Sequence, residues 1–138
     1  MTEVRFVVPG RLSGKGRPRF TTNGGFPRAF TPAKTRAEEL FIATIAKGAM
    51  HGLKPLEGPL WLDVIIVQHP PSSWSKAKIA AANWITTSND LDNIIKGCAD
   101  SLNGIVYADD RQIAKISAER VWRTVGEERV EVTIRTLE

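Results

Sequence analysis

Hydrophobic positions alternate with polar ones in some segments of the chain and recur every three or four residues in others. Alternation, or a nearly continuous apolar run, predicts strands over residues 4–8, 60–67, 112–125 and 129–137. The longer spacing predicts a helix over residues 35–50 and another that begins near Asp90 and is closed at Asn103-Gly104 by a left-handed cap. A short helix is expected between them, over residues 75–83.

The order of these elements (β-α-β-α-α-β-β, ending in a strand pair) predicts a single α+β domain over residues 1–138, with a mixed sheet packed against helices. The strand at 60–67 is apolar almost throughout and is expected at the centre of the sheet. Thr35 and Glu38 have the spacing of a capping box for the first long helix. Residues 105–107 are expected to be extended, and a long basic loop is expected at about residues 11–32.

The composition is that of a soluble globular protein. Of the 138 residues, 42% are hydrophobic and 25% are charged, which is ordinary for this class. No apolar run approaches the roughly 18 residues that a membrane span needs, and the N-terminus lacks the architecture of a signal peptide. The single cysteine, Cys98, excludes an intrachain disulfide. We therefore expect a cytoplasmic protein in a reducing compartment, with no membrane partner.

Positive charge is concentrated at the start of the chain. Residues 1–36 hold eight basic residues and one acidic residue, whereas residues 37–138 carry a net charge of −3, which favours a polyanionic partner. Phe20, Phe26 and Phe30 lie among the basic residues and either stack on bases at a branch point or anchor the loop to the core. The candidate DNA contacts are Arg11, Lys15, Arg17, Arg19, Arg28, Lys34, Arg36, Lys76 and Lys78.

Lys76 and Lys78 are flanked by two tryptophans, Trp74 and Trp84. For both tryptophans, packing against the protein is favoured over stacking on bases. The two lysines form a second candidate surface for phosphate contacts, separate in sequence from the basic loop.

The second long helix carries an unusual number of carboxylates. Five aspartates lie within Ser88–Asp110. At 100° per residue, the apolar residues of the helix form one stripe, and Asp92, Lys96 and Asp100 form a row on nearly the opposite side. Asp90 and Asp92 stand at the start of the helix, and Asp109-Asp110 follow a turn, with no basic neighbour before Arg111.

Two interpretations of these carboxylates compete. Ser88, Asn89 and Asp90 are all good N-caps, early acids suit the positive end of the helix dipole, and Asp92–Lys96 is an ordinary ion pair. Alternatively, Asp90, Asp92 and Asp110 converge, with Asp109, on a site for a hard divalent cation. We favour the second interpretation, because carboxylates that gather without matching cations contribute nothing to a core.

The residue types favour Mg²⁺ as that cation, with Mn²⁺ as a substitute. Zinc is unlikely to bind, because His51 and His69 are isolated and there is one cysteine. An EF-hand is not supported, since Ile95 occupies the position that requires glycine. A metal beside Lys96, in a chain with a basic arm, points to phosphodiester chemistry, in which the lysine orients the phosphate.

Three blocks of the sequence resemble the RusA family of Holliday-junction resolvases. The central block is DLDNIIK at residues 90–96, DSLNG at 100–104 and YADDRQI at 107–113. The N-terminal GKGRPRF at 14–20 and FTP at 30–32, and SWSK at 73–76, are similar to the phage- and prophage-borne branch of that family. The similarity runs across most of the chain, and the central block is its most specific part.

The resemblance implies a homodimeric, Mg²⁺-dependent endonuclease that nicks four-way DNA junctions symmetrically, in a bacterial or phage-infected cell and near its nucleoid. The essential aspartates of the family fall on Asp90, Asp92 and Asp110, and its essential lysine falls on Lys96. Asp109 either assists at the metal or only shapes the turn. Two alternatives stay open: a non-catalytic protein that binds branched DNA, and a nuclease that acts on forks or flaps. No small-molecule cofactor is expected.

Overall fold

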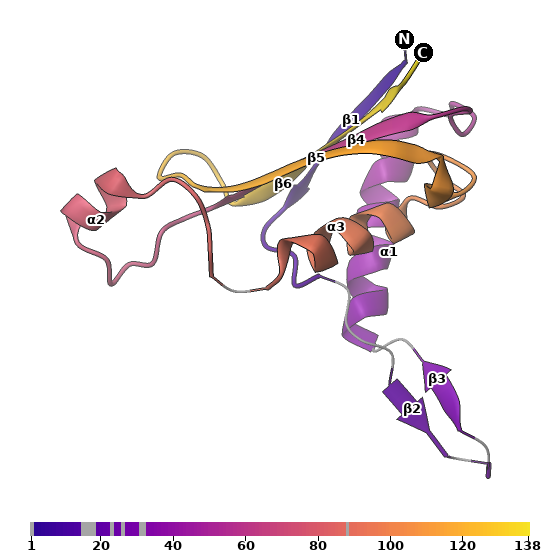
Figure 1. Ribbon diagram of the computed structural model, residues 1–138, viewed down its shortest axis with the longest axis horizontal. Helices are drawn as coiled ribbons and strands as arrows, with labels where there is room; N and C mark the ends of the chain where they lie inside the picture. The colour runs from indigo at the N-terminus through magenta and orange to yellow at the C-terminus, as the bar shows by residue number, and fades with distance from the viewer. Residues whose placement is uncertain (1, 15–18, 23, 26, 31–32, 88) are drawn as a thin grey trace.

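A mixed four-stranded sheet forms the centre of the protein (Figure 1). The structure is a computed structural model, and it describes residues 2–14, 19–22, 24–25, 27–30, 33–87 and 89–138. The strand order is β1-β6-β4-β5, with β4 parallel to β5 and antiparallel to β6, and β6 antiparallel to β1. The strands are β1 (Glu3–Pro9), β4 (Leu60–Gln68), β5 (Ile113–Trp122) and β6 (Arg129–Thr136). The predicted α+β class is therefore confirmed.

Strand β4 has a neighbouring strand on each side, so it is central in the sheet, as its apolar sequence predicted. Leu62 and Val64 stand opposite Ile134 and Val132 of β6, and all four side chains are fully buried. These residues belong to the face of the sheet that the helices cover, so β4 contributes to the core along nearly its whole length.

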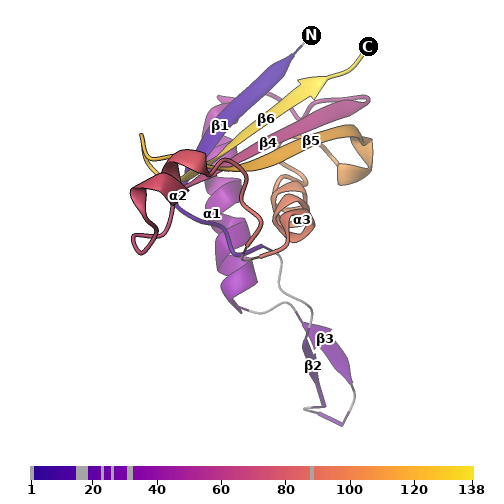
Figure 2. The same ribbon diagram turned by 60° about the vertical axis from the view of Figure 1, so that its left-hand side comes forward.

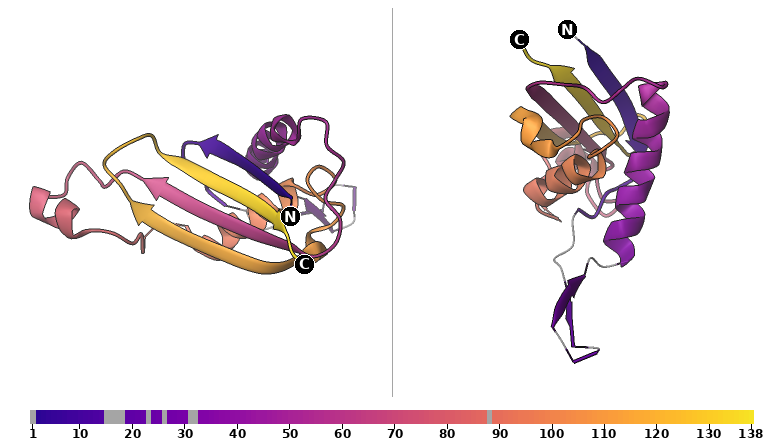
Figure 3. Two further views of the ribbon diagram at one scale, coloured as in Figure 1. Left: turned by 90° about the horizontal axis from the view of Figure 1, so that it is seen from above. Right: turned by 90° about the vertical axis from the view of Figure 1, so that its right-hand side faces the viewer.

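Helices α1 (Ala33–Met50) and α3 (Leu91–Ser101) pack on the same face of the sheet (Figure 3). In α1 the buried residues include Ile42, Ala46 and Met50, which are four residues apart. In α3 the predicted apolar stripe is buried, with Cys98 and Leu102 at 0% exposure. A short helix, α2 (Lys76–Ala81), lies at the far end of the molecule from the termini, and a 3-10 turn, η1 (Asp110–Gln112), leads into β5.

The opposite face of the sheet carries cross-strand polar pairs. Trp61 of β4 lies between Arg135 of β6 and Lys115 of β5, with the Lys115 Nζ 3.9 Å and the Arg135 Cζ 4.8 Å from the ring centroid. Arg135 also pairs with Glu3 at 3.4 Å and with Asp63 at 3.6 Å. Because these charged side chains pair with one another, the functional site is expected on the face of the sheet that the helices cover.

Four local predictions were wrong. The last two strands are not neighbours, because β4 lies between β5 and β6. The predicted capping box does not form: α1 begins at Ala33, so Thr35 lies inside the helix, and Glu38 binds another segment. Residues 105–107 form a turn with one bridge at Tyr107, rather than an extended piece.

The expected basic loop at 11–32 contains a hairpin, which is the fourth difference. Its strands, β2 (Arg19–Thr21) and β3 (Arg28–Phe30), pair antiparallel with Arg19 opposite Phe30. The hairpin extends away from the sheet and helices, beyond the N-terminal end of α1 (Figure 2). We call residues 11–32 the arm.

Candidate active site and nucleic-acid interface

The start of α3 presents two of the predicted catalytic residues to solvent. Asp90 is the N-cap residue, but its side chain makes no capping hydrogen bond, and Asp92 is exposed in the first turn. Lys96 is exposed one turn further along the helix. The helix is held at this end by Arg120 of β5, whose Nη1 donates to the Asn89 carbonyl oxygen at 2.5 Å.

The turn that carries Asp109 and Asp110 is rigidly built. Asp109 caps η1, and its Oδ1 accepts a hydrogen bond from the Arg111 amide at 2.8 Å, which lowers the pKa of the Asp109 carboxyl. The Gln112 Oε1 accepts from the amides of Ala108 and Asp109 at 3.1 and 3.2 Å. Its Nε2 donates to two carbonyl oxygens, of Leu56 and Gly58. This organising role of Gln112 was not among the predictions from the sequence.

The turn is fixed against the C-terminal half of α3. Gly104 adopts a positive φ of 78°, and its amide donates to the Tyr107 carbonyl oxygen at 2.7 Å, so the chain doubles back after the helix. Tyr107 is fully buried, and its hydroxyl donates to the Ala99 carbonyl oxygen at 2.5 Å. Burial raises the pKa of Tyr107, so this hydroxyl stays protonated as a donor.

Asp110 consequently lies beside Asp100. A hydrogen bond with the Asp100 side chain is the largest cause that raises the pKa of Asp110, followed by partial burial and a hydrogen bond with Asp109. Two carboxyl groups this close repel each other when both are ionised, and this repulsion favours the protonated form of Asp110. Asp100 was part of the charged row in the sequence, but we had not predicted it as a site residue. Its position four residues after Lys96 was the available signal.

The predicted convergence of Asp90, Asp92 and Asp110 on one pocket does not occur within this chain. Within the described ranges, no group of three His, Cys, Asp or Glu side chains lies close enough to hold a metal ion. The reason is the rise of the helix: Asp92 and Asp100 are eight residues apart, or about 12 Å along the axis. Because Tyr107 attaches the turn to Ala99, Asp110 meets the end of α3 rather than its start.

The donor atoms at the end of α3 nevertheless suit Mg²⁺. Asp100 and Asp110 offer carboxylate oxygens at short range, and the pKa of Asp110 is raised by its hydrogen bond with Asp100 and by partial burial. Mg²⁺ is commonly bound by one or two carboxylates, with water and substrate phosphate completing its shell. Asp109 is nearby but pairs with Arg111 at 3.3 Å. Of the predicted ligands, Asp110 therefore contacts a carboxyl group that was not among the predicted site residues, that of Asp100.

The predicted DNA contacts of the basic arm and of α1 differ in their surroundings. Arg11 forms an ion pair with Glu128 at 2.6 Å, which raises the pKa of Arg11 and lowers that of Glu128. Lys34 and Arg36 are exposed near the start of α1. Lys15 and Arg17 lie outside the described residues. The backbones of Arg19 and Arg28 belong to β2 and β3 of the arm.

The second basic surface lies at the far end of the molecule. Lys76 and Lys78 are exposed on α2, and the Lys78 Nζ lies 4.3 Å from the Trp74 ring centroid. Trp74 in turn contacts Trp122 edge to face at 5.2 Å, so it packs as expected. Trp84 is 58% exposed, which does not fit the packing role predicted for it.

The base of the arm is fixed by Glu38 of α1. The Glu38 carboxylate accepts hydrogen bonds from the Ser13 amide at 2.9 Å, the Ser13 hydroxyl at 2.6 Å and the Gly14 amide at 3.1 Å. Gly14 has a positive φ of 84°, and a Cβ at this position would lie 3.2 Å from the backbone of Ile94 in α3. The arm therefore leaves the body between α1 and the start of α3, next to Asp90.

An α+β protein that sets a basic arm beside a row of carboxylates belongs to the class that acts on nucleic acids. Comparison with family models identifies the family: residues 9–135 match the model described as Endodeoxyribonuclease RusA, and the chain belongs to this family of endodeoxyribonucleases, which act on branched DNA. It is also 32% identical over 139 residues to the Uncharacterized protein YqaN of Bacillus subtilis (strain 168), covering 96% of this chain and 95% of that protein. In the described ranges, no helix is long and apolar enough to cross a membrane.

Proposed function

We propose that this protein is a Mg²⁺-dependent endonuclease that resolves four-way DNA junctions by paired, symmetric nicks during recombination and repair. The single observation that best supports the metal dependence is the contact between Asp100 and Asp110. It brings the negative charge of two carboxyl groups together at the end of the helix that carries Lys96, in a chain of the RusA endodeoxyribonuclease family. A bound divalent cation would neutralise that charge, lower the pKa of a bound water and stabilise charge on the scissile phosphate.

The protein residues divide the remaining work. Asp90, Asp92 and Asp110, with Asp109 beside the last, are the proposed catalytic and metal-binding carboxylates, and the contact of Asp110 with Asp100 supports adding Asp100 to this proposed group. Lys96 stands between the two ends of α3 and orients the phosphate. The cationic residues of the arm and Lys76 and Lys78 of α2 hold the DNA backbone, and so supply affinity without choice of sequence.

Cleavage of a substrate panel tests this proposal. Four-way, three-way, flap and plain duplex DNA are incubated with Mg²⁺ and, separately, with EDTA. We expect cleavage of the four-way junction in Mg²⁺ alone, and loss of that cleavage in Asp92→Asn with junction binding retained. Cutting in EDTA would contradict the metal dependence, and full activity in Asp92→Asn would contradict the catalytic role proposed for Asp92. Cleavage of flaps or three-way forks in preference to four-way junctions would favour the alternative of a fork or flap nuclease. Binding of junctions without any cleavage would favour the alternative of a non-catalytic DNA-binding protein.

The proposed symmetric cleavage requires a homodimer, because a four-way junction presents two equivalent strands. Val121 and Trp122, at the end of β5, are buried within the chain itself. The outer edge of β5 is a better candidate. β5 is an edge strand, and its Ile116 is 56% exposed. Residues 83–85 cover this edge from Arg120 onward, and the part before Arg120, which pairs with no other described strand, is partly apolar and favours pairing with a second copy.

The direction of the backbone groups on β5 allows a specific test. The Ile85 amide donates to the Arg120 carbonyl oxygen and the Trp122 amide donates to the Asn83 carbonyl oxygen, on the side away from β4. Because backbone groups alternate along a strand, the Ala118 amide points to the same outer side. Ala118→Pro removes that donor without touching the β4 ladder. We expect sedimentation to give a dimer for the wild type and a monomer for Ala118→Pro, and an unchanged dimer would exclude this edge.

A further inference from the structure

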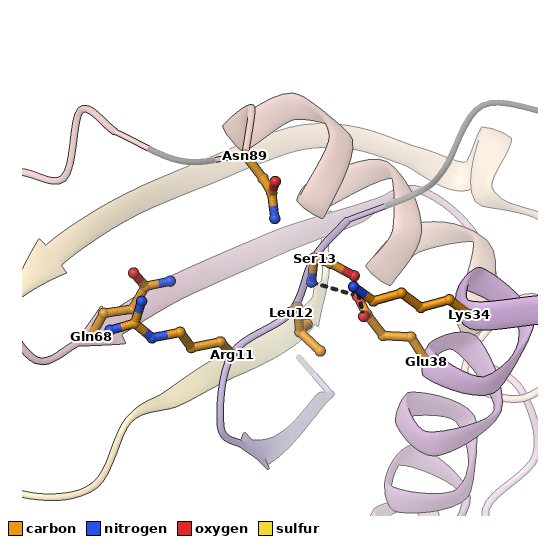
Figure 4. Close-up of a pocket in the computed structure, with 7 residues that line it drawn as sticks. All are labelled: Arg11, Leu12, Ser13, Lys34, Glu38, Gln68 and Asn89. Carbon is orange, nitrogen blue, oxygen red and sulfur yellow. Dashed lines mark hydrogen bonds between the residues drawn. The ribbon is translucent and has the colours of Figure 1, made fainter.

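A cavity of about 380 Å³ opens between the base of the arm and the start of α3 (Figure 4). Its volume lies within the range of small-ligand sites. Its walls come from four parts of the chain: the base of the arm, the start of α1, the end of β4 and the residue before Asp90. The lining residues are Arg11, Leu12, Ser13, Lys34, Glu38, Gln68 and Asn89.

The end of β4 places an amide nitrogen in the wall of the cavity. Gln68 follows four apolar residues on the helix-facing side of this strand, and it is itself 5% exposed. Its Oε1 is buried and points away from the cavity, whereas its Nε2 points into the cavity (Figure 4). The Nε2 donates no hydrogen bond to a residue that the structure describes. An amide donor in so buried a side chain is unfavourable without an acceptor, so a ligand that presents an oxygen here would stabilise it.

A second amide nitrogen approaches the same space from another side. Asn89 is exposed, and its Nδ2 is directed toward the space between Gln68 and Ser13 (Figure 4). Its backbone is held by Arg120, whose Nη1 donates to the Asn89 carbonyl oxygen at 2.5 Å. Two amide donors, one on β4 and one just before α3, therefore face a common space.

The start of α1 supplies a positive charge to the cavity. Lys34 extends from α1 toward the base of the arm, and it forms no ion pair with a described residue (Figure 4). Arg11 contributes less charge, because Glu128 pairs with it at 2.6 Å. The carboxylate of Glu38 already accepts three hydrogen bonds from the base of the arm. The cavity therefore combines amide donors with one cation that has no carboxylate partner among the described residues.

We propose that this cavity binds one phosphodiester group of the DNA strand, next to the phosphate that is cut. The amide nitrogens of Gln68 and Asn89 donate to its oxygens, and Lys34 neutralises its charge. Its place beside the cut follows from Asn89, which directly precedes Asp90, the first proposed catalytic residue. A divalent cation fits less well, because Glu38, the carboxylate among the lining residues, is occupied by three donors. This inference rests on the proposed nuclease function and adds to it a defined phosphate contact.

Uncharged methylphosphonate linkages test this contact one phosphate at a time. They are placed singly around the crossover of a labelled four-way junction, and the affinity is measured by fluorescence anisotropy in EDTA. At one position we expect the wild type to lose affinity by about tenfold, as for a lost hydrogen bond to a charged group. In Lys34→Met and in Gln68→Met the same linkage should change the affinity by about twofold at most, because the contact is already weakened. The phosphate cut in Mg²⁺, mapped separately, should be the neighbouring one.

The two variants should differ in their salt dependence. Lys34→Met removes one cation from a phosphate, so the slope of log affinity against log salt concentration should become shallower by about 0.9. Gln68→Met removes an uncharged donor and should weaken binding about fivefold without changing that slope. Since the Gln68 side chain makes no hydrogen bond to a described residue, this variant should stay folded, which thermal unfolding checks. Lys47→Met, at an exposed lysine of the same helix outside the cavity, is the matched control and should change neither quantity.

The outcomes separate failure of the cavity from failure of the nuclease. If no linkage shows an effect that both variants remove, or if the folded wild type does not bind the junction, the proposal is wrong. It is also wrong if the linkage lies away from the phosphate that is cut. If such a linkage is found but no strand is cut in Mg²⁺, the phosphate site stands and the nuclease function fails.

Thermal unfolding in sodium phosphate, against sodium chloride of equal ionic strength, tests a free phosphate as the ligand. Stabilisation by phosphate that Gln68→Met removes, without any linkage effect on the junction, would assign the cavity to a free anion and overturn the DNA contact. Stabilisation that accompanies the linkage effect would support the same donors as the phosphate site.

Discussion

Replacing Glu38 with alanine is expected to release the arm from the body without unfolding the protein. The Glu38 carboxylate is the shared acceptor for the Ser13 amide, the Ser13 hydroxyl and the Gly14 amide, at 2.6–3.1 Å. These contacts join the first residues of the arm to α1, 24 and 25 residues further along the chain. They also hold Gly14 against the backbone of Asn93 and Ile94, at the start of α3.

The size of the effect follows from the three hydrogen bonds. A hydrogen bond to a charged group contributes roughly 1.5–3 kcal/mol, but these donors are only partly buried, so water replaces part of each contact. We therefore expect Glu38→Ala to lower the free energy of unfolding by about 2–3 kcal/mol. Glu38→Gln keeps one acceptor oxygen and should lose about 1 kcal/mol. Glu57→Ala, at an exposed loop position, should stay within about 0.5 kcal/mol of the wild type.

Urea unfolding gives the stability change, and fluorescence anisotropy with a labelled junction in EDTA gives the affinity. With most molecules still folded, Glu38→Ala should bind the junction more weakly than Glu57→Ala, because the base of its arm is no longer held between α1 and the start of α3. A free energy of unfolding within about 0.5 kcal/mol of the wild type would show that these hydrogen bonds do not hold the arm. If Glu38→Ala shows the expected decrease in the free energy of unfolding but an unchanged junction affinity, the position of the arm does not matter for DNA binding.

Three further predictions concern α3 and the turn after it. Asp110 has a raised pKa in the folded state, so the folded wild type loses stability as pH rises through that pKa. Asp110→Asn should therefore be more stable than the wild type at neutral pH, by at most about 1 kcal/mol, and equally stable in acid. Thermal unfolding measures both differences, and it should also show that Mg²⁺ no longer stabilises this variant. Lys96→Ala should slow junction cleavage by about 10²-fold in single-turnover assays and leave the junction affinity in EDTA almost unchanged. The control Lys47→Ala should change neither the cleavage rate nor the affinity. Gln112→Ala removes four side-chain hydrogen bonds and should cost about 2 kcal/mol in urea unfolding, a loss that an unchanged midpoint would refute.

Patterns within single segments predicted most of the fold. The central position of β4, the buried stripe of α3 and the cap at Gly104 all follow from residues that are close in sequence. The position of β4 between β5 and β6 could not be predicted in this way, because strand pairing depends on contacts that are distant along the chain. Glu38 shows the same limit: its local spacing matches a capping box, but its carboxylate binds Ser13 instead.

The candidate site was predicted in its residue types and not in its geometry. The row of Asp92, Lys96 and Asp100 follows from helical periodicity alone. Where Asp110 meets that row depends on Tyr107, whose burial and contact with Ala99 select one end of the helix. Gln68 was not predicted either, because a polar residue at the end of an apolar strand has no local sign of its lack of a partner.

The position of the carboxylates along α3 weakens the purely structural explanation for them. Asp90 and Asp92 stand at the positive end of the helix dipole and would be favourable there without any function. Asp100 stands near the negative end, where the last turn has no basic residue, and Asp110 is added beside it. An acid in that place is unfavourable for the helix, and two acids in contact are more so. The proposed cation would offset this cost, and the stability of Asp110→Asn with and without Mg²⁺ measures that effect directly.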